Sequence, residues 1–150
     1  MKIINFVILL ALVACVRAST FRNAEWCIGD VARKIISRCA AAHGTNDDDL
    51  QQYLQLKPAA SDPAKCFRGC LFQECQLFKE DHTFSSDLAR RTAFITSYGN
   101  WEVYKVMEQN ANYCIQHIKT GENTCDSAEE FLQCYVNHSP IPISLQALFQ

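Results

Sequence analysis

The amino-acid sequence predicts an all-α fold, built as one domain and held together by disulfide bonds. Apolar residues recur at helical spacing between capping residues and glycine or proline stops, and no convincing alternating strand occurs. Hydrophobic residues make up 49% of the 150 residues, with only 5 Gly and 4 Pro, which excludes a disordered chain. The 9 cysteines are typical of a small extracellular domain.

Residues 1–18 are interpreted as a signal peptide. They have a basic start at Lys2, an apolar run over 3–16, and a small residue, Ala18, at the predicted cleavage site. The apolar run is too short to span a bilayer, which argues against the alternative of an N-terminal membrane anchor. The sequence therefore predicts a secreted, extracellular protein whose single domain covers 19–150.

Three helices are predicted between the signal peptide and residue 78. The first covers 20–43, where apolar residues recur every two to four positions, and Gly44 lies just beyond it. The second covers 46–57: an asparagine caps it, three aspartates occupy its electropositive first turn, and a proline ends it. The third covers 62–78 and opens with an aspartate cap followed by proline.

A fourth helix opens at Ser86 or Asp87 and ends near Gly99. Part of it, 92–98, is also compatible with a short strand because it is rich in β-branched and aromatic residues. The helical interpretation aligns one face, which comprises Leu88, either Arg91 or Thr92, and Ile95.

The fifth and sixth helices complete the predicted fold. The fifth begins after the capping residue Asn100 and ends at Gly121. The sixth begins near Asp126, where Ser127 and Glu130 have the spacing of a capping box. About six helices are therefore expected in a single all-α domain.

The charge distribution argues against a nucleic-acid partner. The formal net charge is −2, and the basic residues are scattered rather than gathered with aromatic residues into a patch. We assign them to solvated helix faces; they include Arg33, Lys34, Arg38, Arg90 and Arg91.

Eight cysteines remain once Cys15 leaves with the signal peptide, and an even number in a secreted chain indicates disulfides. Structural zinc is the competing interpretation, but the sequence has no C-x₂-C pair, so no metal is expected. Cys66 and Cys70 are one helical turn apart with parallel Cβ vectors, and Cys125 and Cys134 are about 13 Å apart along a helix. Each of these cysteines must therefore pair with a different element.

The spacing Cys39-x₂₆-Cys66-x₃-Cys70-x₄₃-Cys114-x₁₀-Cys125-x₈-Cys134 resembles the six-cysteine signature of the insect pheromone- and general-odorant-binding proteins. The segments KCFRGCLFQECQLFKEDHTFSSD (65–87) and CDSAEEFLQCYVNH (125–138) resemble that family's third and sixth helices. The resemblance implies a six-helix, disulfide-stapled cup enclosing an apolar cavity. It also implies the pairing Cys39–Cys70, Cys66–Cys125 and Cys114–Cys134, which obeys the rule of separate partners.

Cys27 and Cys75 depart from this signature and by elimination would form a fourth bridge. On a straight helix Cys27 lies about 18 Å from Cys39, whereas Cys75 lies about 7.5 Å from Cys70. If Cys39–Cys70 also forms, the first helix must cross at an angle or bend. We predict a bend, with Gly29-Asp30 as the break and Asp30 as the new cap. A disulfide-linked homodimer and a shuffled connectivity are the alternatives.

The resemblance implies a carrier that binds and solubilises a small hydrophobic ligand, such as an odorant or pheromone, in an internal cavity. Disulfides can hold the helices of so small a domain around an internal cavity, where apolar side chains would otherwise pack together. Each candidate for the lining is equally compatible with ordinary core packing; the candidates are Phe67, Leu71, Leu88, Ile95, Tyr98, Trp101, Val103, Met107, Leu132 and Tyr135.

The C-terminal tail, 139–150, carries five large apolar residues, which a solvated tail would not need. Tails of similar family members close the pocket, so Leu145 and Phe149 join the predicted ligand contacts. A dimer contact or a disordered tail is the alternative. The tail has no side-chain carboxylate, and a pH switch would therefore use a histidine; we expect ligand affinity to fall below about pH 6 through His138.

Other functions fit the sequence less well. Cys114 with His117, and Ser97 with Asp87, could be written as nucleophile and base, but no orienting group or nucleophile elbow accompanies either pair, so neither catalysis nor a cofactor is expected. The functional alternative is an effector like the salivary D7 proteins, which sequester host amines or lipid mediators. Amine capture would require acidic groups facing the pocket. A homodimer and an encounter with a membrane receptor are compatible with both functions.

Overall fold

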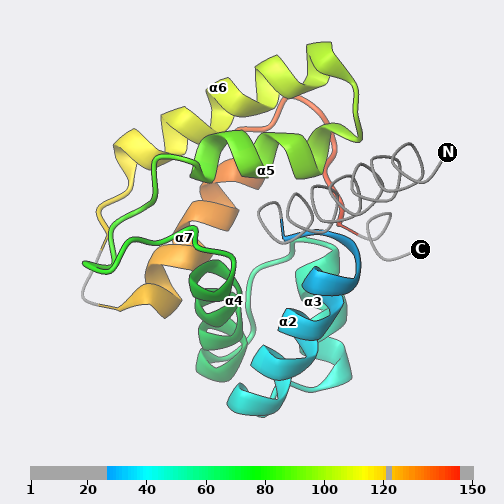
Figure 1. Ribbon diagram of the computed structural model, residues 1–150, viewed down its shortest axis with the longest axis vertical. Coiled ribbons are helices and arrows are strands. Elements are labelled where there is room, and N and C mark those ends of the chain that lie inside the picture. The colour runs from blue at the N-terminus through cyan, green and yellow to red at the C-terminus, as the bar shows by residue number, and fades with distance from the viewer. Residues whose placement is uncertain (1–26, 121–122, 146–150) are drawn as a thin grey trace, which may run out of the picture.

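The computed structural model describes residues 27–120 and 123–145, and this part of the chain is all-α, as predicted (Figure 1). The predicted signal peptide, Phe149 and the end of the tail lie outside the described residues. Within them the structure has no strand beyond an isolated bridge between Phe78 and Phe84. The helices are α2 (Gly29–His43), α3 (Asp47–Leu54), α4 (Asp62–Glu74), α5 (Leu88–Ser97), α6 (Trp101–His117) and α7 (Thr124–Asn137).

Local capping chemistry determines where several helices begin. Asn46 and Asp49 form a reciprocal capping box at the start of α3, with the backbone N–H of Asp49 donating to the Asn46 side chain at 2.8 Å. Asn100 caps α6 as predicted. The cap of α4 is Ser61, one residue earlier than expected, because its hydroxyl accepts from the backbone N–H of Ala64.

Several helix boundaries differ from the sequence prediction. α3 ends at Leu54 rather than at 57, because Leu56 adopts a left-handed conformation with φ 54°. α4 ends at Glu74 rather than near 78, because Gln76 adopts a left-handed conformation with φ 56°. α6 ends at His117, before Gly121. α7 begins at Thr124 under an Asn123 cap, and Ser127, the predicted capping residue, instead donates its hydroxyl to the Asn123 carbonyl. The segment 92–98 is helical through Ser97, so the strand alternative is wrong.

The first helix of the described residues begins at the position of the predicted break. α2 begins at Gly29, and the chain turns just before it, with positive φ at Cys27 (55°) and Gly29 (60°). The residue at the cap position is Ile28, not Asp30, which lies within the first turn of α2. Cys27 therefore lies outside the helix, and the helical rise no longer fixes its distance from Cys39. Both bridges can then form.

Four disulfides connect the helices. Cys27–Cys75 and Cys39–Cys70 both join α2 or its leading turn to α4, with Cα atoms 5.6 and 5.8 Å apart. Cys66–Cys125 joins α4 to α7, and Cys114–Cys134 joins α6 to α7. These are the expected pairings, and the shuffled and intermolecular alternatives do not apply to this structure.

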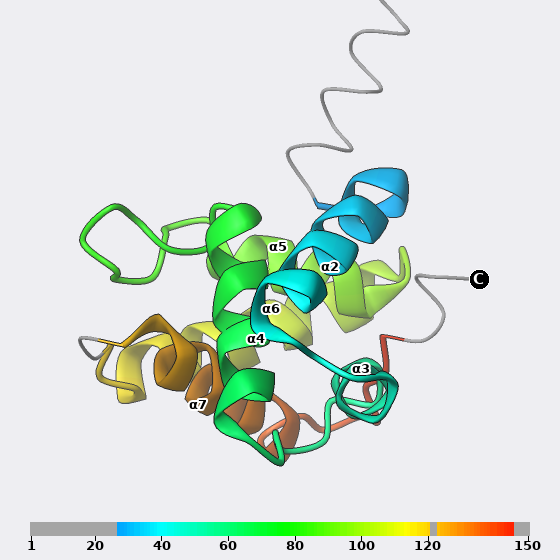
Figure 2. The same cartoon turned by 90° about the horizontal axis from the view of Figure 1, so that it is seen from below.

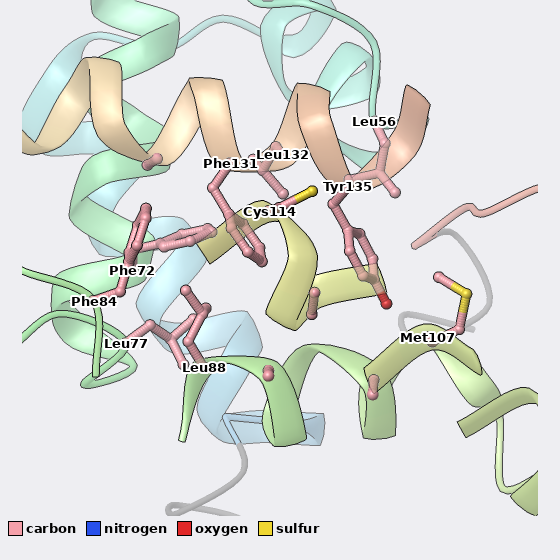
Figure 3. Close-up of a cluster of buried hydrophobic side chains, with 14 of the residues drawn as sticks. Leu56, Phe72, Leu77, Phe84, Leu88, Met107, Cys114, Phe131, Leu132 and Tyr135 are labelled. Atoms are coloured by element: carbon pink, nitrogen blue, oxygen red, sulfur yellow. The ribbon is translucent and has the colours of Figure 1, made fainter. Parts of the chain in front are cut away.

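The helices pack in two groups with α7 between them (Figures 1 and 2). α5 and α6 lie side by side at one end, while α2, α3 and α4 lie toward the other, and α4 packs closely against α7. Apolar side chains from α4 to α7 form the main core, in which Phe131 and Tyr135 of α7 meet residues of α5 and α6 (Figure 3). A buried ion pair between Arg68 and Glu129 ties α4 to α7.

Candidate functional site

An apolar pocket of about 90 Å³ lies beside the main core. α2, α3, α4, α5, α7 and the C-terminal tail all contribute to it. Because a water molecule needs roughly 10–15 Å³ of such space, the pocket can hold a small molecule. Its lining comprises Cys27, Ala32, Ile35, Ile36, Tyr53, Leu56, Leu71, Phe72, Cys75, Leu77, Arg91, Thr92, Ile95, Thr96, Leu132, Tyr135 and Leu145.

Five of the sequence-predicted ligand contacts line this pocket: Leu71, Ile95, Leu132, Tyr135 and Leu145. They come from α4, α5, α7 and the tail, so the structure brings together residues that are up to 74 positions apart in the chain.

The other predicted contacts lie elsewhere. Phe67, Leu88 and Met107 are fully buried in the cores, because their helix faces meet other helices directly. Tyr98 and Trp101 are 52% and 62% exposed at the junction of α5 and α6. Val103 is partly buried against the main core. None of these six lines the pocket; Phe149 lies outside the described residues.

Sequence reasoning missed the wall formed by α2 and α3. Ile35 and Tyr53 line the pocket from those helices, and both lie on apolar helix faces recognisable in the sequence. Periodicity shows that these faces are buried but not that they face empty space. The signal for Leu56, in the turn after α3, is weaker still because its left-handed backbone (φ 54°) follows no helical period.

A hydroxyl pair lies on the α5 and α7 side of the pocket. The Thr96 hydroxyl lies 2.6 Å from the Tyr135 hydroxyl and donates to the Thr92 carbonyl at 2.8 Å. Since a threonine has one hydroxyl hydrogen, Tyr135 is the donor in the pair. Burial raises the pKa of Tyr135 above its ordinary value, and the hydrogen bond to Thr96 opposes this only in part.

Tyr53 supplies a second phenol from α3. Burial raises its pKa to about 12, while the nearby Arg68 guanidinium acts in the opposite direction. The Tyr53 ring contacts Phe67 edge-on, with ring centroids 5.4 Å apart. Both phenols of the pocket are therefore neutral at physiological pH, so they add hydrogen-bonding capacity without adding charge.

Arg91 is buried at the pocket wall, which corrects its assignment to a solvated helix face. Its residue is 7% exposed, and its Nη1 donates to the Cys75 carbonyl at 2.8 Å. That carbonyl stands at the end of α4, where the helix leaves it without an intrahelical partner. The buried cation therefore completes the C-terminus of α4, where a positive charge is favourable.

The first residues of the tail pack against the pocket. Leu145 is 7% exposed, and its backbone N–H donates to the Leu54 carbonyl at 2.8 Å. The Tyr98 hydroxyl donates to the Ser144 carbonyl. The described part of the tail, 139–145, thus bridges α3 and the end of α5.

The residues considered for metal binding or catalysis are committed to other interactions. Within the described residues, ligating atoms come close together at Cys114, Cys134 and His138, but both sulfurs belong to one disulfide. That bond also prevents Cys114 from acting as a nucleophile. The Ser97 hydroxyl donates to the Phe94 carbonyl at 3.1 Å.

His138, the predicted pH switch, caps the end of α7. Its ring contacts Tyr113, with ring centroids 4.8 Å apart, and its Nδ1 lies 3.0 Å from the Cys134 carbonyl. The predicted effect of His138 on ligand affinity stays a prediction.

This chain is similar in structure and in sequence to known odorant-binding proteins. A structure similar to this one is the odorant-binding protein OBP28a of Drosophila melanogaster, with a TM-score of 0.65 and 19% identity over 71% of this chain and 88% of that one. General odorant-binding protein 19d of the same fly is 25% identical over 128 residues, or 85% of each chain. The family model of the PBP/GOBP family matches residues 28–138.

The described part of the chain, with six helices joined by disulfides, has the all-α fold of the odorant-binding proteins. The chain belongs to the PBP/GOBP family. Cys27 and the tail lie just outside the matched residues, at either end, so two parts of the pocket wall are contributed by segments beyond the family match. No helix in the described part of the chain has the length and apolar character needed to cross a membrane.

Proposed function

We propose that this protein is a secreted, extracellular carrier that binds a small hydrophobic ligand, such as an odorant or pheromone, in the pocket described above. The observation that carries the proposal is the lining itself: most of its side chains are apolar and they come from five helices and the tail. Family membership supports a carrier of small hydrophobic molecules.

The alternative is a sequestering effector for amines or lipid mediators. The described lining contains one charged residue, Arg91, and no carboxylate. A buried ammonium group needs an opposite charge or several acceptors, and a guanidinium repels it. The lining therefore favours a neutral or acidic ligand over an amine, while a lipid mediator fits either function. A homodimer and a receptor encounter are further proposals compatible with both.

Filling the pocket is the direct test. Ile95 lines the pocket from α5, so Ile95→Trp is expected to place the larger side chain in the open space and to weaken binding of a fluorescent apolar probe by at least about tenfold. Val106→Trp is the matched control, because Val106 is 42% exposed on α6. Circular dichroism checks that both variants fold.

Two results would contradict the carrier proposal. The first is wild-type protein, with all four bridges formed, that binds no apolar probe. The second is folded Ile95→Trp protein that binds as tightly as the control. Displacement of the probe by a cationic aromatic amine such as tryptamine, but not by neutral or acidic apolar molecules, would instead favour the effector function.

A further inference from the structure

Arg91 brings a positive charge to a pocket whose other described lining residues are neutral. It lies on α5 one helical turn before Ile95, and both side chains line the pocket. Its side chain is only 9% exposed. A charged group this deeply buried is costly unless hydrogen bonds and opposite charge compensate it.

The protein compensates this charge incompletely. A guanidinium has five N–H donors. The structure gives those of Arg91 one hydrogen bond, to the Cys75 carbonyl, and one longer ion pair, in which Nη2 lies 3.7 Å from an Asp87 carboxylate oxygen. The Nε–H group is buried without a hydrogen-bond partner. Asp87 is itself 44% exposed and also pairs with Arg90 at 3.2 Å, so its charge is shared and screened by water.

We propose that Arg91 binds the carboxylate of the ligand, so that the preferred ligand is an aliphatic carboxylic acid in its anionic form. This inference rests on the proposed carrier function and names the ligand class for the same pocket. A carboxylate matches the planar donor pattern of a guanidinium and supplies the opposite charge that Asp87 provides only at a distance. The apolar walls from α2, α4 and α7 would hold the alkyl chain.

The remaining polar groups of the pocket do not select for an acid. The Tyr135 hydroxyl donates to the Thr96 hydroxyl, which in turn donates to the Thr92 carbonyl. The hydroxyls of Tyr53 and Thr92 both donate and accept, so they suit an alcohol as well as an acid. Arg91 only donates, and it alone among the described lining residues carries charge. Discrimination between an acid and an alcohol therefore falls on Arg91.

The test compares four ligands that share one chain: octanoate, methyl octanoate, octanol and octane. Each displaces a neutral fluorescent probe from the full mature protein at neutral pH. In a pocket without a cation, octanoate binds more weakly than octanol because its charge must be desolvated. With Arg91 as its partner, octanoate is expected to bind about tenfold more tightly than octanol, with the ester in between.

Arg91→Met removes the charge and keeps most of the side-chain length. It is expected to reverse the order of octanoate and octanol while the neutral probe still binds. Arg33→Met, which removes an exposed arginine of α2, is the matched control and is expected to keep the preference for octanoate. If loss of the bond to Cys75 prevents Arg91→Met from folding, Arg91→Lys retains the charge and is expected to retain the preference.

The outcomes separate this inference from the carrier function. Wild-type protein that binds the probe but prefers octanol overturns the role of Arg91 and leaves the carrier intact, whatever the variants do. Folded Arg91→Met that still prefers octanoate also overturns it. Wild-type protein that binds no probe overturns the carrier function, and the inference falls with it.

Discussion

The close approach of α4 to the start of α7 depends on a single residue without a side chain. A Cβ atom at Gly69 of α4 would lie 3.0 Å from both the Cα and the backbone N of Cys125, and 3.1 Å from the carbonyl carbon of Thr124. Backbone atoms cannot turn aside as a flexible side chain can. The neighbouring Cys66–Cys125 bridge, with Cα atoms 4.3 Å apart, holds the start of α7 in this position.

Gly69→Ala therefore sets two effects against each other. Alanine is favoured over glycine inside a helix by about 1 kcal/mol. The clash with α7 requires a shift between two covalently joined helices, and overpacking of this kind costs roughly 1–3 kcal/mol. We expect the clash to win, so that chemical denaturation with the disulfides intact shows a lower free energy of unfolding.

Gln73→Ala is the control for this measurement, because Gln73 is exposed on the same helix. It is expected to change the free energy of unfolding by no more than about 0.5 kcal/mol. A Gly69→Ala protein as stable as wild type, or more stable, would show that α4 and α7 can separate at little cost.

At the scale of single residues, sequence reasoning located buried faces better than it located the pocket. Leu71 and Met107 occupy equally convincing apolar positions, yet Leu71 lines the pocket and Met107 is fully buried in the core. The difference depends on whether a facing helix fills the space beside the side chain. The apolar periodicity of one helix carries no information about its neighbours. The burial of Arg91 is hard to predict for the same reason. Its position aligns with an inner helix face, but the carbonyl that accepts its hydrogen bond lies 16 positions away in the sequence.

At the scale of elements, helix starts were more predictable than helix ends. The caps at Asn46 and Asn100 act within one turn, so their chemistry is visible in the local sequence. The end of α4 is a tertiary feature instead. Cys75, its C-terminal cap, is bonded to Cys27 and accepts a hydrogen bond from Arg91, and neither contact is local.

The Cys27–Cys75 bridge is the second of two between the same elements, which makes its contribution testable. With Cys39–Cys70 intact, the path that this bridge closes is about 17 residues, for which the loss of chain entropy corresponds to about 3 kcal/mol. We expect Cys27→Ser/Cys75→Ser to fold, to lose up to that amount of stability, and to bind the apolar probe more weakly, because both cysteines line the pocket.

Cys39→Ser/Cys70→Ser provides the comparison in thermal unfolding and probe titration. Cys39 is fully buried, so its removal also places a polar hydroxyl in the core. It is expected to cost more stability than the first pair. Equal losses from the two pairs, or failure of Cys27→Ser/Cys75→Ser to fold, would contradict the expectation that the Cys27–Cys75 bridge contributes less to stability than the Cys39–Cys70 bridge.

At the scale of the whole molecule, covalent bonds hold some pocket walls and not others. The four bridges link α2, α4, α6 and α7. The walls contributed by α3, α5 and the tail are held by packing and hydrogen bonds alone. Where ligand exchange moves part of the wall, the parts without covalent links open at the lowest cost. The tail is the smallest of these, and it is joined to α3 by the 2.8 Å bond from Leu145.

A chain ending at Ser139 tests whether the tail is such a closure. Its helices and all four bridges remain, so it is expected to fold, as circular dichroism and a mass eight hydrogens below the all-thiol form would report. Loss of the apolar cover supplied by Leu145 is expected to weaken probe affinity by about tenfold, chiefly through faster dissociation in stopped-flow measurements.

Tyr98→Phe, which removes only the hydroxyl bonded to the Ser144 carbonyl, should give a smaller increase in the dissociation rate in the full-length chain. This graded response distinguishes a closure from a core element, because loosening a closure changes exchange before it changes stability. A truncated protein that unfolds would make the tail part of the folding core, whereas a truncated protein with the wild-type dissociation rate would place ligand entry at another wall. In the second case α3, the other short element without a bridge, becomes the next segment to test for movement during ligand exchange.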